Sequence, residues 1–424
     1  MNETKLFRKD FTMVVIGQII SLFGNSILRY ALPLYLLNQT HSASLFGIVT
    51  ACSFLPMLLL SPVGGIVADR VNKRNVMVIL DFSTAGLILL FSLTMHTFNL
   101  IGLLIAVLMI LYGIQGAYQP TVQASIPLLV SGNNLMPANA IINLVNSISG
   151  LIGPVLGGVL FGFYGLTPIL YISIFCFVLS AVMEIFITIP FKKEPQSEGI
   201  IKLAKHDMKL SFQFIHENPI LLRVCLLIAS INLVFSALLI IGIPIIINEH
   251  LGFSQSVGNQ LYGYAEGALA AGGLIGGLLT GVIGKKLSVQ KSHGILALCT
   301  LSLLPIGIAL VLPISSMAVY LIIVISCTCM MVLSTLFSIE MITYAQMVTP
   351  ANLLGKVMAL MSVIIMCAHP LGQLIYGVLF ELLKANISII FFAALIVCSG
   401  ITLAGRSIIR SIPPISDCTR HVHS

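Results

Sequence analysis

The chain alternates between long apolar stretches and short polar connections from one end to the other. Each apolar stretch reaches about 20 residues, the length that an α-helix needs to cross the hydrocarbon core of a bilayer. Helices are expected rather than strands, because backbone groups in lipid must satisfy their own hydrogen bonds and the alternating pattern of a membrane barrel is absent. The pattern predicts membrane spans at residues 12–37, 44–68, 76–95, 100–127, 138–160, 166–190, 221–247, 258–284, 292–311, 317–343, 356–380 and 386–409.

Composition supports this interpretation. Hydrophobic residues make up 58% of the 424-residue chain and charged residues only 8%, whereas soluble domains carry about 25% charged residues. So few charges cannot cover the surface of a soluble globule. We therefore predict an all-α integral membrane protein with twelve transmembrane helices.

The basic residues predict how the spans are oriented. If the N-terminus lies in the cytoplasm, all 21 Lys and Arg residues except Arg29 and Lys384 fall on the inner side or at its membrane boundary. Such a bias is the usual orientation signal of membrane proteins, so both termini are expected to be cytoplasmic in a multi-pass protein of the cell membrane. The net charge of +7 is then an orientation signal, and no nucleic-acid partner is expected.

One long polar connection divides the chain in two. Residues 191–220 carry a basic amphipathic pattern in which apolar side chains alternate with Lys202, Lys205 and Lys209, which suits a helix lying on the inner membrane surface. The predicted organisation is a six-helix bundle at 1–190, a cytoplasmic linker at 191–220, a second six-helix bundle at 221–410 and a cytoplasmic tail at 411–424.

The two halves show a weak internal repeat. The segment GGIVADRVNKR at 64–74 aligns with TGVIGKKLSVQ at 280–290, and the same offset places Pro154 on Pro370. Duplicated six-helix halves with a site near the bilayer midplane are the architecture of alternating-access transporters.

The loop after the second span carries a recognisable motif. Its Gly65-x-x-x-Asp69-Arg70-x-x-Lys73-Arg74 pattern resembles the signature loop of the major facilitator superfamily. That family usually has Gly where this chain has Asn72, and Asn tolerates left-handed backbone geometry, so we expect the turn to survive. The resemblance implies a conformational latch at the inner ends of moving helices, made of Gly65, Asp69, Arg70, Lys73, Arg74 and Asp81.

Two further motifs narrow the resemblance. Gly153-Pro154-x-x-Gly157-Gly158 in the fifth span is similar to the Gly-Pro motif of the superfamily's antiporters, although small residues also serve plain helix packing. The stretches Asp207 to Pro219 and Pro127 to Ala140 are similar to the macrolide-efflux and enterobactin-exporter group. That likeness implies export of drugs or siderophores, usually against a proton gradient.

Polar residues inside the spans are candidates for a substrate cavity, because such groups are costly in lipid and usually face a cavity or a partner. The resemblance implies that the first and fourth helices line a central cavity, and each has a polar face. The predicted cavity residues are Gln18, Asn25, Arg29, Tyr112, Gln115, Gln119 and Gln123. They could instead link neighbouring helices, and Arg29 could extend towards the interface. The fourth span lacks the Arg that many antiporters of the superfamily carry, so a coupling scheme based on that Arg does not transfer.

Three titratable residues are candidates for proton coupling. Glu266 lies in a run of small residues, Glu340 lies near the inner end of the tenth span, and His369 precedes Pro370. Each could instead be a hydrogen-bonded structural group, and this is the favoured interpretation of His369. Glu184 falls in the sixth span, which the resemblance places at the periphery, and a structural role is expected for it.

The sequence as a whole predicts a secondary transporter that exports an amphipathic small molecule, such as a drug, a macrolide or a siderophore, by proton antiport and alternating access. An importer, a lipid or lysolipid flippase, and a non-transporting membrane sensor are the alternatives. Enzyme motifs such as a Walker loop, HExxH or GxSxG are absent. We therefore expect no catalytic residue, no metal and no cofactor. The expected partners are a small-molecule substrate, the coupling proton and membrane lipids, with the chain acting as a monomer.

Overall fold

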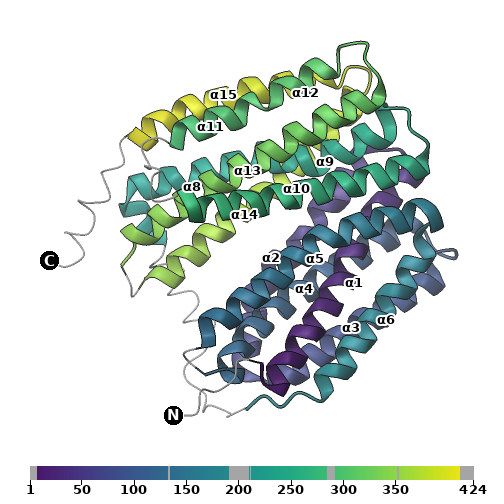
Figure 1. The fold of residues 1–424 in the computed structure, drawn as a ribbon, viewed down its shortest axis with the longest axis vertical. Coiled ribbons are helices and arrows are strands. Elements are labelled where there is room, and N and C mark those ends of the chain that lie inside the picture. The colour runs from purple at the N-terminus through teal and green to yellow at the C-terminus, as the bar shows by residue number, and fades with distance from the viewer. Residues whose placement is uncertain are drawn as a thin grey trace. The chain divides into compact units, whose positions relative to one another are not determined.

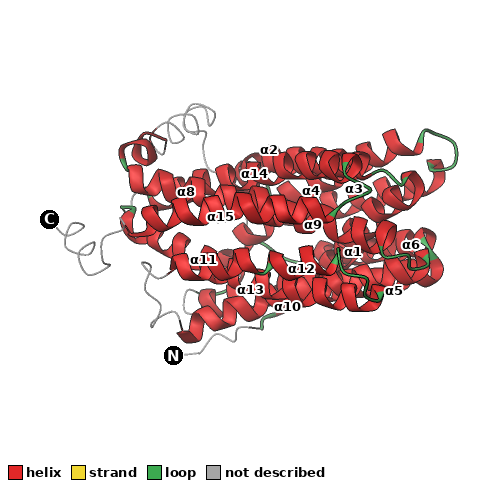
Figure 2. Ribbon diagram, turned by 90° about the horizontal axis from the view of Figure 1, so that it is seen from above, coloured by secondary structure: helices red, strands yellow, loops and turns green. Residues whose placement is uncertain are grey.

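The computed structural model describes residues 7–131, 134–190, 210, 212–283, 292–350 and 353–410, with the side chains of 62–70 and 283 excepted. Within these residues the chain is helical and contains no strand (Figure 2). Most of the expected linker and the whole expected tail lie outside the described residues.

Twelve helical segments of the described residues are long and apolar enough to cross a membrane, which confirms the predicted spans. The first six are α1 (Lys9–Thr40), α2 (Ala43–Arg70), α3 (Lys73–Thr94), α4 (Leu100–Leu129), α5 (Leu135–Tyr164) and α6 (Leu166–Ile185). The seventh combines α8 (Pro219–Ile231), η2 (Asn232–Ser236), α9 (Ala237–Ile245) and η3 (Ile246–His250). The remainder are α10 (Gln255–Ile283), α11 (Ser292–Leu301) with α12 (Leu303–Ala309), α13 (Ser316–Val348), α14 (Leu354–Leu382) and α15 (Ser388–Arg410).

Several helices begin at side chains that accept hydrogen bonds from the free backbone N–H groups of the first turn. Asn99 caps α4, Ser315 caps α13, and Asn72 caps α3 by accepting from the Arg74 N–H at 3.1 Å. The φ angle of Asn72 is −59°, so the expectation of a left-handed turn there is wrong. Asn72 therefore acts as an N-cap, and its position does not require glycine's conformational freedom.

Residue contacts divide the chain into two compact units. Unit 1 consists of Met1–Gln196 and Phe253–Gly267, so it includes α1 to α6 and the start of α10. In this unit α2 packs along α4, α1 packs against α5 and α6, and α3 packs against α4 and α6 (Figure 1). This packing places α1, α4 and α5 next to one another, and the start of α10 joins them, because the Tyr30 hydroxyl of α1 donates to the Asn259 carbonyl oxygen.

Unit 2 consists of Ser197–Gly252 and Ala268–Ser424. Its α14 packs against α8, η2 and α9, while α11 and α12 contact α13 and α15. Gly372 of α14 lies directly against the π-helical turn η2, where an added Cβ would come 2.2 Å from the Leu233 carbonyl oxygen. Two π-helical turns in one span are unusual, because such turns are rare and occur mostly singly.

Large apolar side chains stand exposed on helices of both units. Leu59, Leu93 and Phe175 in unit 1, and Leu278 and Ile396 in unit 2, are each more than 60% exposed. A water-soluble surface rarely presents so much apolar area, whereas hydrocarbon accommodates it.

Candidate functional site

The predicted polar faces of α1 and α4 contact each other in unit 1. Asn25 Nδ2 donates to Gln115 Oε1 over 3.0 Å, and the Arg29 guanidinium carbon lies 4.2 Å from the centroid of the Tyr112 ring. Asn25 and Tyr112 are buried, whereas Arg29 and Gln115 are half-buried. These four predicted cavity residues therefore form one patch.

The start of α10 adds an acid and an aromatic pair to this patch. Tyr262 stacks on Tyr30 with ring centroids 5.0 Å apart, and its hydroxyl donates to the Glu266 carboxyl one helical turn later. Tyr112 also lies close enough to Tyr262 to interact with it electrostatically. We call Arg29, Tyr30, Tyr112, Tyr262 and Glu266 the tyrosine site.

The two charged residues of the tyrosine site do not pair with each other. Among described side chains, Tyr262 is the hydrogen-bond partner of Glu266, while Arg29 rests on an aromatic face. A guanidinium held this way can be transferred to an anionic ligand group, because a cation on a ring is bound less strongly than in an ion pair with hydrogen bonds. A carboxyl with a single neutral donor can hold or release a proton as its surroundings change.

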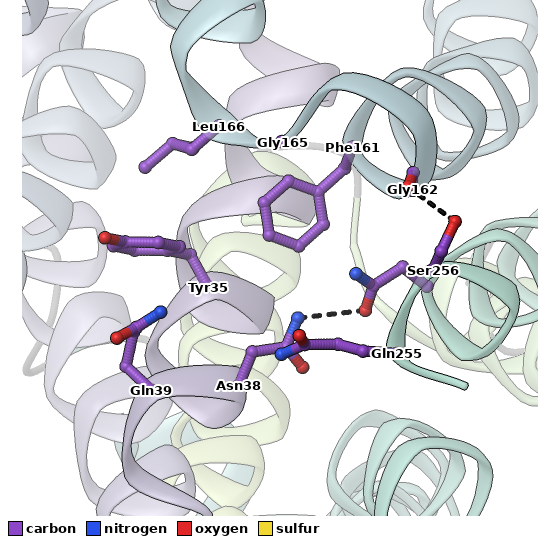
Figure 3. A pocket seen from close by; sticks show the side chains of 10 residues that line it. Tyr35, Asn38, Gln39, Phe161, Gly162, Gly165, Leu166, Gln255 and Ser256 are labelled. Carbon is purple, nitrogen blue, oxygen red and sulfur yellow. Dashed lines mark hydrogen bonds between the residues drawn. The ribbon is translucent and has the colours of Figure 1, made fainter. Parts of the chain in front are cut away.

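Unit 1 also contains a cavity that was not predicted from the sequence (Figure 3). Its volume is about 280 Å³, and it is lined by Tyr35, Asn38, Gln39, Phe161, Gly162, Gly165, Leu166, Gln255, Ser256 and Asn259. Asn259 connects the two features, because its backbone oxygen accepts from the Tyr30 hydroxyl and its side chain accepts from Asn38 Nδ2 at 3.0 Å. A volume of this size is near the lower end for small-molecule pockets, about 300 Å³.

The predicted Gly-Pro motif is the surface through which α5 contacts α1 and α10. A Cβ on Gly153 would meet Ser26, and one on Gly157 would come 3.1 Å from the Tyr30 ring. Of these three glycines, Gly158 lies closest to the backbone of another helix, because a Cβ there would come 2.8 Å from the Cα of Gly263. Pro154 lies inside α5 between these glycines. The motif therefore allows the close helix packing that positions the tyrosine site.

The predicted latch is only partly within the described residues. The side chains of Gly65, Asp69 and Arg70 lie outside them. Lys73 is the half-buried first residue of α3, and Arg74 Nη1 lies 3.5 Å from the carbonyl oxygen of Ile185 at the end of α6. Asp81 does not contact Arg74 but accepts from the Ser21 hydroxyl over 3.0 Å.

A second polar cluster, which we call the carboxyl cluster, lies inside unit 1. It contains the side chains of Gln18, Ser21, Asp81, Tyr118 and Glu184, each at most 3% exposed. Gln18 Nε2 donates to the Tyr118 hydroxyl over 2.7 Å, and that hydroxyl donates to Glu184 Oε1 over 2.8 Å. Gln18 thus lies in this cluster and not in the patch with Asn25 and Arg29.

Comparisons with known proteins identify the family. The model of the Major Facilitator Superfamily matches residues 14–373. The chain belongs to this superfamily. Macrolide efflux protein A of Streptococcus pyogenes is 24% identical over 412 residues, covering 95% of this chain and 96% of that protein. The enterobactin exporter EntS of Citrobacter koseri is 25% identical over 383 residues, covering 87% and 84%.

Solved structures agree with the fold of the superfamily. The crystal structure of a mutant of the nucleoside transporter NupG superposes with a TM-score of 0.73 at 12% identity, covering 95% of this chain and 99% of that chain. The chain is therefore a multi-pass helical transporter of the cell membrane. The superfamily consists of transporters and not of enzymes.

The remaining predicted site residues do not take part in the contacts described for the tyrosine site. On α4, Gln119 is half-buried with an unpartnered Nε2, and Gln123 is exposed. In unit 2 the Ser292 hydroxyl donates to Glu340, which is buried between α11 and α13, and His369 is half-buried on α14.

Proposed function

We propose that this chain exports an amphipathic small molecule in exchange for protons, by alternating access. Two relatives that match it nearly end to end are named as a macrolide efflux protein and an enterobactin exporter. Both names describe export. At such low sequence identity, a shared superfamily supports the mode of transport more strongly than it supports the identity of the substrate.

The observation that carries the proposal is the makeup of the tyrosine site. Its three tyrosine rings offer flat apolar faces with polar ends, and the Asn25–Gln115 pair beside them supplies neutral hydrogen-bonding groups. Such a surface suits a ligand that is largely apolar with scattered polar groups. Arg29 provides a single cation for a ligand that also carries negative charge.

Glu266 is the proposed link between substrate and proton. It shares Tyr262 with the aromatic surface, so a ligand that packs on the Tyr262 ring also changes the hydrogen bonding of the acid. A hydrogen bond to the carboxylate favours its charged form, so a change in that bond changes the affinity of the acid for a proton. Substrate binding and proton binding would then affect each other through one hydroxyl group. Glu340 and His369 remain further candidates on unit 2.

The names of the two relatives support the outward direction, and the proposed orientation then gives the latch its place. The Lys and Arg distribution supports cytoplasmic termini, so the signature loop and Arg74 would lie at the cytoplasmic side. We infer that the latch residues of this loop control opening towards the cytoplasm, where an exporter must collect its substrate. The proposed cargo and coupling ion need no further cofactor, and we expect the monomer to be the transporting unit.

A susceptibility panel tests this function directly. The chain is expressed in a strain that lacks its own efflux pumps, and growth is measured with macrolides, other amphipathic drugs and siderophores. We expect raised resistance to a subset of amphipathic compounds, abolished by Tyr112→Ala. The matched control is Tyr171→Ala, because Tyr171 on α6 is 58% exposed and lies outside the tyrosine site. Wild-type protein at normal membrane levels that changes no susceptibility would contradict the proposal.

A further inference from the structure

Two carboxyl groups are buried together in the carboxyl cluster. They lie on α3 and α6, whereas the acid of the tyrosine site, Glu266, lies on α10. Asp81 of α3 is 2% exposed and Glu184 of α6 is 1% exposed. They lie close enough for their charges to interact. Two ionised carboxylates in such surroundings would each lose their hydration and also repel each other.

The hydrogen bonds of the carboxyl cluster show a shortage of donors. Three buried oxygens have no hydrogen-bond partner, namely Gln18 Oε1, Asp81 Oδ2 and Glu184 Oε2. Ser180 is a further hydrogen-bond partner of Asp81, but its hydroxyl also lies 3.1 Å from the Gly17 carbonyl oxygen, so one hydrogen is shared between two acceptors. An added proton on either carboxyl would turn one unpaired acceptor into a donor for another. Buried polar atoms are rarely left unpaired, so the arrangement itself indicates a place for a proton.

No described cation neutralises the two acids. The titratable group that faces them from α4 is Tyr118, while α1 contributes only the neutral side chains of Gln18 and Ser21. Among the charged residues at the helix ends, Asp10 accepts from the Thr188 backbone N–H. Arg74 binds Asn75 and approaches the end of α6. Neither forms an ion pair with the carboxyl groups, so a proton is the remaining source of positive charge within the described residues.

We propose that Asp81 and Glu184 form a proton-binding site that holds at least one proton between them, and that its loading and release help to drive export. The inference rests on the proposed proton antiport. In the loading step a proton from solvent adds to a carboxylate oxygen and forms an O–H bond. In the release step that bond breaks and the proton returns to solvent. The Asp81–Glu184 pair is thus a second proton-binding site in addition to Glu266.

Helices α1 and α4 connect the proposed proton site to the substrate surface. The same two helices are joined by Gln18 and Tyr118 in the carboxyl cluster and by Asn25 and Gln115 in the substrate patch. When Glu184 loses its proton, its carboxylate attracts the Tyr118 hydroxyl more strongly. A shift of that hydroxyl is passed to α1 through Gln18, which moves the helix pair that also holds Arg29 over Tyr112.

Infrared spectroscopy of the purified protein in lipid tests the proton site without any substrate. A protonated carboxyl gives a C=O band that is distinct from carboxylate bands, and its pH titration can be followed directly. We expect a component of this band to disappear in the double variant Asp81→Asn/Glu184→Gln and to persist in Glu266→Gln and in Glu217→Gln, whose side chain is exposed. In Tyr118→Phe the component should persist to more alkaline pH, because a carboxylate donor is lost. An unchanged band in the double variant overturns the proposal.

Transport by proteoliposomes separates this site from the proposed function. Radiolabelled erythromycin is the probe, with a pH gradient for uphill transport and equal pH for exchange. We expect the double variant to lose uphill transport while keeping exchange, since a merely structural role would reduce both. Equal loss of both activities in correctly folded double variant overturns the coupling role. Wild-type protein that moves no erythromycin contradicts macrolide export, while the infrared result still decides whether the pair holds a proton.

Discussion

At the scale of single residues, one hydroxyl group connects the two parts of the candidate site. Tyr262 stacks on Tyr30 through its ring and donates to Glu266 through its oxygen. A group in this position can report whether a ligand occupies the aromatic surface. The acid that receives its hydrogen bond is therefore the best residue at which to test coupling.

Glu266→Gln removes the titrating group and keeps the size of the side chain. The amide resembles a permanently protonated acid, so the transporter can still bind and exchange substrate but cannot use a proton gradient. We expect accumulation against a gradient to fall to the equilibrium ratio, with exchange at equal pH retained. Both are measured in proteoliposomes, with Glu217→Gln as the control. Full uphill transport by Glu266→Gln would remove this residue from the coupling scheme.

Part of the tyrosine site could be predicted from residue spacing and part could not. Steps of seven and four residues predicted Gln18, Asn25 and Arg29 on one face of α1, and all three contact α4. The spacing did not predict that this face is shared between two clusters, with Gln18 bonded to Tyr118 in the carboxyl cluster. Tyr30 and Tyr262 gave no signal, because a tyrosine in an apolar run is indistinguishable from an ordinary core residue until its neighbours are known.

At the scale of helices, glycines on α5 decide how closely the elements of the site approach. Gly158→Ala would place a methyl group 2.8 Å from the Gly263 Cα, so α5 and α10 must separate. We expect a loss of about 1–3 kcal/mol in stability, the usual cost of overpacking, together with impaired transport. Gly150→Ala is the control on the same helix, because its Cβ would meet nothing within 4 Å. Unfolding measurements in detergent compare the two, and equal stability would contradict the packing role.

The start of α3 gives a second test at this scale. If Asn72 is an N-cap, Asn72→Ala should destabilise the protein by about 1 kcal/mol, while Asn72→Ser keeps a capping oxygen and Asn72→Gly costs only a few tenths. These differences are measured by unfolding in detergent. Asn72→Gly would instead be the most stable variant if the residue required a left-handed backbone. Its φ angle of −59° argues against that outcome.

Helix positions could be predicted more fully than their internal geometry. Length and apolar content decide whether a segment spans the bilayer, and both are visible in the sequence. The π-helical turns η2 and η3 were not predicted, because their residues are as apolar as those of an α-helix. At η2 the Leu233 carbonyl packs against Gly372 of α14, which is distant in the sequence. The residues around Leu233 alone therefore do not predict this contact.

At the scale of the whole molecule, the signature loop and its counterpart in the second half differ in charge. The repeat places Lys285 at the position that aligns with Asp69, so both halves keep positive charge but only the first keeps the carboxylate. Positive charge alone is sufficient to orient helices in a membrane. The carboxylate therefore needs another explanation, and a charge cluster that forms and breaks during the transport cycle supplies one.

Asp69→Asn tests this explanation while leaving the basic residues of the loop in place. We expect slower export, because an uncharged amide binds the loop cations more weakly, while insertion and orientation stay unchanged because they depend on Lys and Arg. The measurements are initial export rates, membrane levels and labelling of Cys418 by an impermeant maleimide in inverted vesicles. Lys285→Gln is the control at the aligned position and should affect export less. Export by Asp69→Asn at the wild-type rate would mean that the loop serves orientation alone, since every feature beyond its positive charge would then be dispensable.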